Sequence, residues 1–212
     1  MIIQGYLYTY LYIILILLIT SILNEVFKVR LVITRKIVHI GVTFSYFIMH
    51  YYFGYSIHMI IVPITFVIIN YISYKKNFFK GIESKESLGT IFYPISVLIM
   101  ATITYFNNTF DPAYAIGLFC MGLGDGFAPL FANFLKSKKI INNKTITGSS
   151  TVLIFSSLVA FFFGIYFNLN YEIIDILIIG FSASLIELIG VKGYDNLYLP
   201  LGIFMIVIML GV

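Results

Sequence analysis

The sequence predicts an all-α integral membrane protein, a single domain over residues 1–212 built as a polytopic bundle of about seven or eight transmembrane helices. Composition is the first reason. The chain is 60% hydrophobic and 10% charged, with a mean hydropathy of +1.01, whereas soluble domains carry roughly 25% charged residues. Pattern is the second reason, because apolar runs of about 20 residues alternate with short polar breaks.

The apolar runs and their breaks define the spans in order. We place them at about 6–23, 37–53, 56–73, 88–105, 113–132, 149–168, 174–190 and 197–212. The first run lacks a basic region and a small-residue cleavage site, so we expect a retained span rather than a signal peptide. Gly54 makes the second and third spans a tight hairpin, which leaves a count of seven open. The fifth span contains glycines around Asp125 and also Pro129, which should loosen its helix.

The loop charges predict the orientation. Basic residues follow the first, third and fifth spans, and Lys192 follows the seventh: Lys28, Arg30, Arg35, Lys36, Lys75, Lys76, Lys80, Lys85, Lys136, Lys138, Lys139 and Lys144. The loop after the third span also carries Glu83 and Glu86, and the intervening loops carry only acids. By the positive-inside rule, the basic side is cytoplasmic and both termini lie outside.

We expect a bacterial or archaeal cell membrane as the location. The net charge of +4 reflects these short loops and the anionic membrane surface, so no nucleic-acid partner is expected. The single cysteine, Cys120, excludes an internal disulfide framework, and no Cys/His spacing predicts a zinc site.

Asp125 is the most informative polar residue. A carboxylate at membrane depth costs about 2.5–3.5 kcal/mol on insertion scales, so such residues usually serve a partner, an ion or a pathway. Gly124 and Gly126 flank it and would let the backbone approach a ligand closely. The alternative is that the glycines pack helices closely and that Asp125 pairs with a neighbouring lysine.

Two basic motifs are expected at the same face. Arg35, Lys36 and His39 begin the second span, where a guanidinium suits bidentate phosphate contact and a lysine adds a point charge. Their alternative role is an interfacial pair that sets topology. Residues 144–149, Lys-Thr-Ile-Thr-Gly-Ser, open the sixth span. They resemble an anion site at a helix N-terminus, although Ser and Thr also simply cap helices.

Acidic and amide groups complete the predicted site. Glu187 and the pair Asp195-Asn196 bracket the turn before the last span. They could hold a cation or position Lys144 or Arg35, and the alternative is that Asp-Asn merely makes a turn. The outer face carries nothing comparable, and His50 and His58 receive no role.

Together these segments resemble a known family, the membrane polyprenol, dolichol and phytol kinases with the CTP-dependent diacylglycerol kinases. The resemblance covers most of the chain and rests on short motifs in family order. They are Arg35-Lys36-x-x-His39, Gly89-Thr90 with Pro94, Gly124-Asp125 before Ala128, Lys144-Thr145-x-x-Gly148-Ser149, Glu187, and Asp195-Asn196-Leu197 before Pro200. The family often has an acidic residue where this chain has Thr147.

The resemblance implies a lipid kinase that moves the γ-phosphoryl group of a nucleotide, characteristically CTP with ATP as the alternative, onto a lipid alcohol such as a polyprenol or diacylglycerol. Mg²⁺ would bridge the phosphates. Asp125, Lys36 and Arg35 are the catalytic candidates, with Asp125 as either a metal ligand or a proton acceptor. The nucleotide candidates are Lys144, Thr145, Gly148, Ser149, Gly124, Gly126 and Asn196, and the metal candidates are Asp125, Asp195 and Glu187.

Two other functions fit the same residues. A phospholipid cytidylyltransferase would also use CTP and a carboxylate-bound metal, and it would release pyrophosphate. A small transporter would use Asp125 and Glu187 as coupling groups within the membrane. The gathering of polar residues at one face and the lack of an evident inverted repeat speak against transport.

Overall fold

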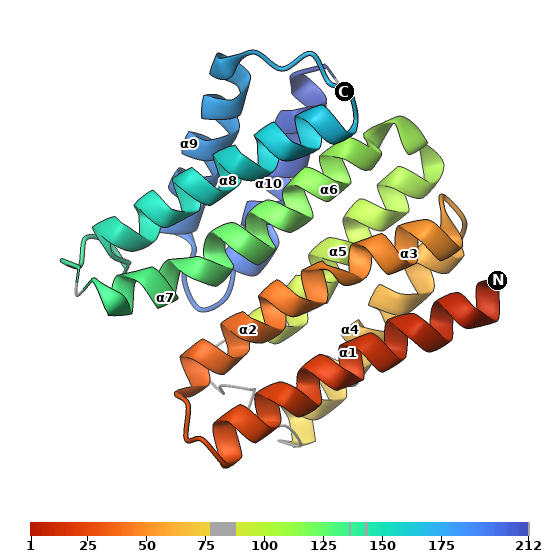
Figure 1. Cartoon of the computed structure of the whole chain (residues 1–212), viewed down its shortest axis with the longest axis horizontal. Coiled ribbons are helices and arrows are strands. Elements are labelled where there is room, and N and C mark those ends of the chain that lie inside the picture. Colours follow the sequence, from red (N-terminus) through yellow and green to blue (C-terminus); the bar gives the residue numbers. More distant parts are fainter. Residues whose placement is uncertain (77–87, 136, 143, 212) are drawn as a thin grey trace.

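The computed structural model describes residues 1–76, 88–135, 137–142 and 144–211 (Figure 1). Lys80, Glu83, Lys85, Glu86 and Lys136 lie outside these residues. The described chain is helical, and its helices are α1 (Ile2–Glu25), α2 (Leu31–Thr43), α3 (Ser45–Phe53), α4 (His58–Lys76), α5 (Gly89–Phe106), α6 (Asp111–Phe119), α7 (Gly126–Phe134), α8 (Ile146–Tyr166), α9 (Ile173–Ile189) and α10 (Asp195–Met209). A 3₁₀ turn, Asn108–Phe110, precedes α6, and a π-helical segment, Cys120–Asp125, joins α6 to α7.

The fold confirms the prediction of a helical membrane bundle. Among the described residues, six segments are long and apolar enough to cross a membrane, and two of them combine helices: α2 with α3, and α6 with α7. The 17 residues of α9 and the 15 residues of α10 make shorter apolar helices. The sequence placed most helix boundaries within a few residues, but α2 begins at Leu31 rather than at about residue 37.

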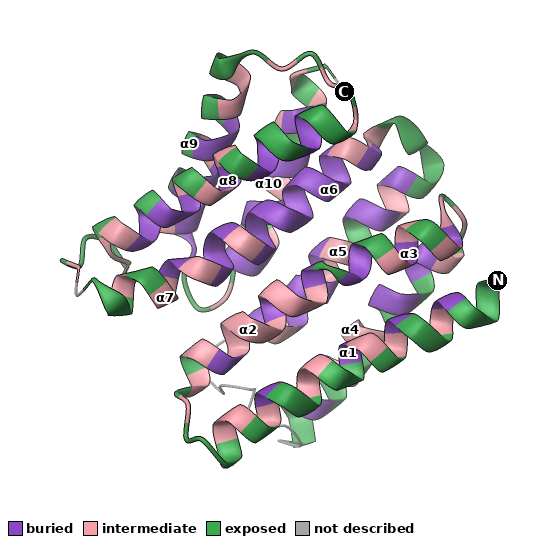
Figure 2. Cartoon of the chain, in the orientation of Figure 1, coloured by how far each residue is buried: buried purple, intermediate pink, exposed green. Residues whose placement is uncertain are grey.

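The span formed by α6, the π segment and α7 lies at the centre. In this span 67% of the most apolar window is buried inside the protein, against 17% for α1. Figure 2 shows the same contrast, with α6 mostly buried and α1 mostly exposed. In Figure 1, α1, α2–α3, α6–α7 and α8 run side by side as successive neighbours. The remaining helices, α4, α5, α9 and α10, lie behind them.

Small residues set the closest helix contacts, because lipid leaves little hydrophobic force to draw helices together. A Cβ atom on Gly122 would lie 2.0 Å from Thr43 Oγ1, and one on Gly117 would lie 2.6 Å from the Pro200 carbonyl oxygen. The Thr43 hydroxyl also donates to the His39 carbonyl at 2.8 Å. Such back-bonding bends helices, and α2 ends at this threonine.

The connections fall at two ends of the bundle. The loops that join α1 to α2, α7 to α8, and α9 to α10 lie at one end, together with the last turn of α4 (Figure 1). All described lysines and arginines belong to these loops or to the adjoining helix turns, and we call this the basic end. The predicted grouping of charges therefore holds in three dimensions.

Candidate functional site

A cavity of about 650 Å³ opens at the basic end. Its walls come from α2, the π segment with α7, the hairpin before α8, the start of α8, and the turn between α9 and α10. The predicted site residues that line it are Arg35, Lys36, His39, Asp125, Lys144, Thr145, Gly148, Glu187, Asp195 and Asn196. Segments that are far apart in the sequence thus meet at one place.

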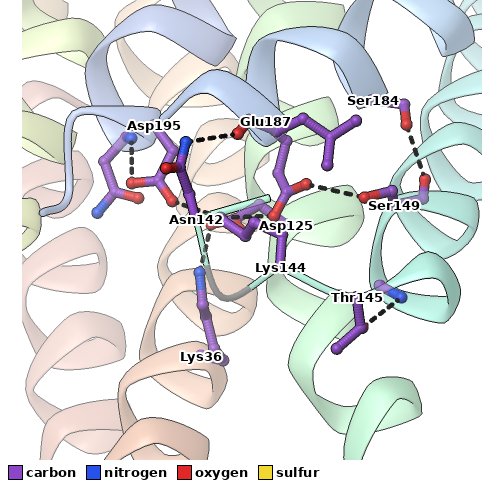
Figure 3. Close-up of polar contacts among 12 residues, drawn as sticks. Lys36, Asp125, Asn142, Lys144, Thr145, Ser149, Ser184, Glu187 and Asp195 are labelled. Carbon is purple, nitrogen blue, oxygen red and sulfur yellow. Dashed lines mark hydrogen bonds and ion pairs between the residues drawn. The ribbon is translucent and has the colours of Figure 1, made fainter. Parts of the chain in front are cut away.

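Asp125 forms the first ion pair of this cavity. It is 2% exposed and ends the π segment, a widened helical turn of a kind that is frequent at functional sites. Lys36 on α2 donates a hydrogen bond to Asp125 Oδ2, as Figure 3 shows. The attraction between the two opposite charges offsets part of the cost of their burial.

Lys144 forms the second ionic group, with two carboxylates. Its Nζ lies 2.9 Å from Asp195 Oδ2 and 2.5 Å from Glu187 Oε1 (Figure 3). Burial lowers the pKa of Lys144, but the nearby carboxylates, above all Asp125, raise it more, so the net pKa lies above its usual value. Lys144 therefore stays protonated at physiological pH.

A compact hairpin positions Lys144. The Lys144 amide donates to the Ile141 carbonyl at 2.8 Å, and the Ile140 amide donates to the Lys144 carbonyl at 2.8 Å. Asn142 Nδ2 donates to the Leu188 carbonyl at 3.1 Å, which ties this hairpin to α9. No pattern in the sequence indicates a role for Asn142, because its hydrogen bond depends on a helix that lies far away in the chain.

The start of α8 behaves as a capped helix. Thr145 precedes it, and Thr145 Oγ1 accepts the Gly148 amide at 3.1 Å. This is the capping alternative, and it occupies a backbone donor that an anion would otherwise use. Ser149 instead donates to Glu187 Oε2 at 3.4 Å, so it supports a site carboxylate. Ser149 is not among the described residues that line the cavity.

The two glycines beside Asp125 lie at helix contacts rather than in the cavity wall. A Cβ atom on Gly124 would lie 2.9 Å from Ser156 Oγ, and one on Gly126 would lie 2.6 Å from Ile40 Cγ1. Their small size therefore lets α8 approach the π segment and lets α2 approach the start of α7. The glycines thus match the alternative in which they pack helices closely, and this packing holds Asp125 opposite Lys36.

The turn between α9 and α10 brings Asp195 and Asn196 to the site. A Cβ atom on Gly190 would lie 2.5 Å from Asp195 Cβ, so the tight turn needs a glycine. Asn196 Nδ2 donates to the Gly89 carbonyl at 2.8 Å. This bond fastens the start of α10 to the start of α5 and leaves the Asn196 side chain as a structural link.

Arg35 and His39 lie on the same face of α2 and line the cavity. The His39 ring stacks on Tyr93, with centroids 5.0 Å apart and planes 8° from parallel. His39 is 4% exposed, and its Nδ1 has no hydrogen-bond partner among the described residues.

The positions of the carboxylates and lysines in the cavity limit how it could bind a metal ion. Among the described residues, no three His, Cys, Asp or Glu side chains are placed to share a metal ion, and Lys144 Nζ lies between Glu187 and Asp195. An all-protein metal cage does not match this arrangement. Mg²⁺ usually binds one or two carboxylates together with substrate phosphates, and one or two of Asp125, Asp195 and Glu187 would fit that mode once released from their lysines.

A smaller polar cluster lies at the opposite end of the bundle, where the sequence indicated nothing comparable. Asp111 is 1% exposed, accepts from the Tyr46 hydroxyl at 3.0 Å and from the Tyr55 hydroxyl at 3.4 Å, and lies 3.4 Å from His50 Nδ1. A helix-starting aspartate gives no signal for such a cluster. Because no lysine or arginine joins it among the described residues, it is a poor match for phosphate.

Comparison with protein-family models, with curated proteins and with solved structures finds no match.

Proposed function

We propose that this protein is a membrane lipid kinase that transfers the γ-phosphoryl group of a nucleotide, characteristically CTP, to the hydroxyl of a lipid alcohol. One observation carries the proposal. Arg35 and Lys36 of α2 and Lys144 of the hairpin before α8 reach one cavity of about 650 Å³, and carboxylates lie beside the two lysines. Such a cavity suits a polyphosphate accompanied by a divalent cation. The order of short motifs that resembles the polyprenol kinase family supports the same reaction.

The ion pairs imply an exchange of partners when the nucleotide binds. Lys36 and Lys144 are held by carboxylates, so a triphosphate would compete with Asp125 and with Glu187 or Asp195 for these lysines. The released carboxylates would then be available to Mg²⁺ or to a proton. The charged groups of such a site are in place before the nucleotide binds. Binding would therefore exchange the partners of the existing ion pairs, and no distant side chain would have to move in.

The reaction itself needs few groups. The alcohol oxygen attacks the γ-phosphorus, the bond from that phosphorus to the β,γ-bridging oxygen breaks, and the nucleoside diphosphate leaves with the bond electrons. The hydroxyl proton passes to an acceptor, for which Asp125 is the candidate. Bound Mg²⁺ would neutralise charge on the phosphates. Arg35, Lys36 and Lys144 would hold the transferred group in line with the attacking oxygen.

Asp125→Asn tests the proposal, since it removes a charge and keeps the size of the side chain. In purified protein given CTP labelled in the γ-phosphate, Mg²⁺ and a polyprenol, we expect turnover to fall by at least about 100-fold. The matched control is Asp111→Asn, a buried carboxylate at the opposite end. It should keep its turnover wherever its thermal unfolding shows a folded protein.

Undiminished turnover in Asp125→Asn would remove this residue from the chemistry. Release of pyrophosphate instead of a nucleoside diphosphate would indicate nucleotidyl transfer to a phospholipid and would replace the kinase proposal. Uptake of a solute into proteoliposomes, with no turnover of nucleotide, would indicate transport.

A further inference from the structure

A second cavity adjoins the polar one and is almost entirely apolar. It has a volume of about 290 Å³ and lies between α1, α2–α3, α4 and α5. Its apolar wall includes Ile13, Leu17, Val42, Phe66 and Val97. The surrounding helices pack as two groups, because α1 packs on α2 and α3 while α4 packs on α5. The cavity is the space between these groups.

The cavity opens to the membrane on one side. Ile14 of α1 and Ile69 of α4 line it and are 49% and 40% exposed, so its rim faces lipid. Toward the end opposite the basic end, hydrogen bonds join α1 to α4. The Tyr6 hydroxyl lies 2.7 Å from His58 Nδ1, and the Tyr10 hydroxyl lies 2.9 Å from Thr65 Oγ1. The hydrocarbon chain of a lipid could therefore enter between α1 and α4, on the side of these hydrogen bonds that is nearer the basic end.

The apolar cavity and the polar cavity share Arg35 and His39. Thr90 also lines the apolar cavity, and neither Thr90 Oγ1 nor His39 Nδ1 has a hydrogen-bond partner among the described residues. A buried polar atom without a partner costs about 1–3 kcal/mol. His39 Nδ1 at the junction and Thr90 Oγ1 in the wall of the apolar cavity therefore point to a ligand that brings a polar group to them.

We propose that the apolar cavity holds the hydrocarbon chain of a lipid alcohol and places its hydroxyl at His39 and Thr90, facing the polar cavity. A hydroxyl can both donate and accept, as the imidazole nitrogen and the threonine oxygen require. The identification of this ligand as the phosphoryl acceptor rests on the proposed kinase function. The binding of an alcohol at the junction does not.

The size of the cavity selects the kind of alcohol. At about 290 Å³ it lies just below the range of roughly 300–1,000 Å³ for small-molecule sites, which suits one apolar chain better than two. We therefore infer that a single-chain alcohol of the polyprenol or phytol kind binds here in preference to a diacylglycerol.

A third cavity serves as a control. It has a volume of about 380 Å³ and is lined by Phe44, Phe119, Phe155, Leu158 and other apolar residues. None of its described lining residues belongs to the polar cavity. It is as apolar as the second cavity, yet a chain lodged there would not carry its hydroxyl to Arg35 or His39.

Val97→Phe and Leu158→Phe test the proposal as a matched pair, since each adds a ring to one apolar cavity. With farnesol as the acceptor, we expect Val97→Phe to raise the acceptor KM about tenfold or more and to leave the nucleotide KM unchanged. Leu158→Phe should leave both values within about twofold of the original. Equal effects of the two variants, or no effect of either on a protein that phosphorylates farnesol, would overturn the assignment of this cavity.

A binding experiment without nucleotide separates this inference from the kinase proposal. A farnesol analogue with a diazirine in its chain should crosslink to α1, α4 or α5 of the unmodified protein, and free farnesol should compete better than the hydrocarbon without the hydroxyl. His39→Phe keeps a flat ring against Tyr93 but removes Nδ1, so it should abolish that preference.

The outcomes are distinct. Crosslinks in these helices, with no transfer of phosphate to any alcohol, would keep the binding site and reject the kinase. Phosphate transfer with crosslinks confined to the third cavity would keep the kinase and reject this site.

Discussion

Lys144 shows how single residues set the chemistry of the polar cavity. Its ammonium group contacts Glu187 and Asp195, and Asp125 lies close enough to raise its pKa. Burial alone would favour the neutral amine, so the carboxylates keep the charge in place. The positive charge of Lys144 in turn offsets the repulsion between the carboxylates of Glu187 and Asp195, which lie near one another.

Lys144→Met should impair nucleotide binding and stability together. Loss of a charge-assisted bond of about 1.5–3 kcal/mol corresponds to a rise in nucleotide KM of about 10-fold to 100-fold. Removal of the cation also leaves Glu187 and Asp195 without their common partner, so the melting temperature should fall. Steady-state kinetics and thermal unfolding measure the two effects.

Lys138→Met on the same hairpin is the control, because Lys138 is exposed and does not line the cavity. If it changed the nucleotide KM as much as Lys144→Met, the general charge of the hairpin would explain the effect.

The pH dependence of stability follows from the same residue. The folded-state pKa of Lys144 lies above the ordinary value of 10.5. The stability that Lys144 contributes is therefore fully present below that ordinary value and is lost only as the pH rises through the raised pKa. The difference in melting temperature between the unmodified protein and Lys144→Met should stay constant from about pH 7 to about pH 10. A difference that vanished within this range would contradict the raised pKa.

At the scale of elements, the π segment and α2 form the part of the fold that holds Lys36 opposite Asp125. Gly122 and Gly124 place the π segment against α2 and α8, and Gly126 places the start of α7 against α2. The sequence left two roles open for the glycines, backbone approach to a ligand and close packing of helices, and their positions match the second role. A pattern of glycines in one span predicts close approach, and it does not say whether a helix or a ligand approaches.

Gly122→Ala should loosen this contact. Its Cβ would lie 2.0 Å from Thr43 Oγ1, so α2 or the π segment must shift, at a cost of about 1–3 kcal/mol. We expect a lower melting temperature and a lower turnover, because the shift separates Lys36 from Asp125. Gly164→Ala, whose Cβ would lie 3.3 Å from the Tyr171 ring, should change both much less. Similar losses in the two variants would show that any added methyl group has this effect.

The whole molecule is a bundle whose described basic residues gather at one end (Figure 1). The positive-inside rule predicts that this end faces the cytoplasm. In a Cys120→Ala background, Ile141→Cys at the basic end and Ile57→Cys at the opposite end are both exposed positions. A membrane-impermeant maleimide should label Ile57→Cys in intact cells and Ile141→Cys only in inverted vesicles. The reverse labelling would invert the topology.

Much of the bundle was predictable because membrane spans are apolar runs of fixed length between polar breaks. The convergence of Lys36, Asp125, Lys144, Glu187 and Asp195 was also predictable, since topology alone sends their segments to one end. The sequence also offered a neighbouring lysine as the partner of Asp125, and Lys144 or Arg35 as the partner of Glu187 and Asp195. The choice among these partners was not predictable, because the position of Lys144 depends on how the hairpin folds. The cluster around Asp111 and the apolar cavity beside His39 depend on the packing of distant helices, which no local motif records.

Transfer of a labelled γ-phosphate tests the central claim most directly. Purified full-length protein in detergent would be given Mg²⁺ and each labelled nucleotide in turn with farnesol, a long polyprenol, phytol or diacylglycerol. We predict that the label moves to a single-chain alcohol and that one nucleoside diphosphate forms for each lipid phosphate. Label that stays on the nucleotide with every alcohol, or that appears as pyrophosphate, would contradict the claim.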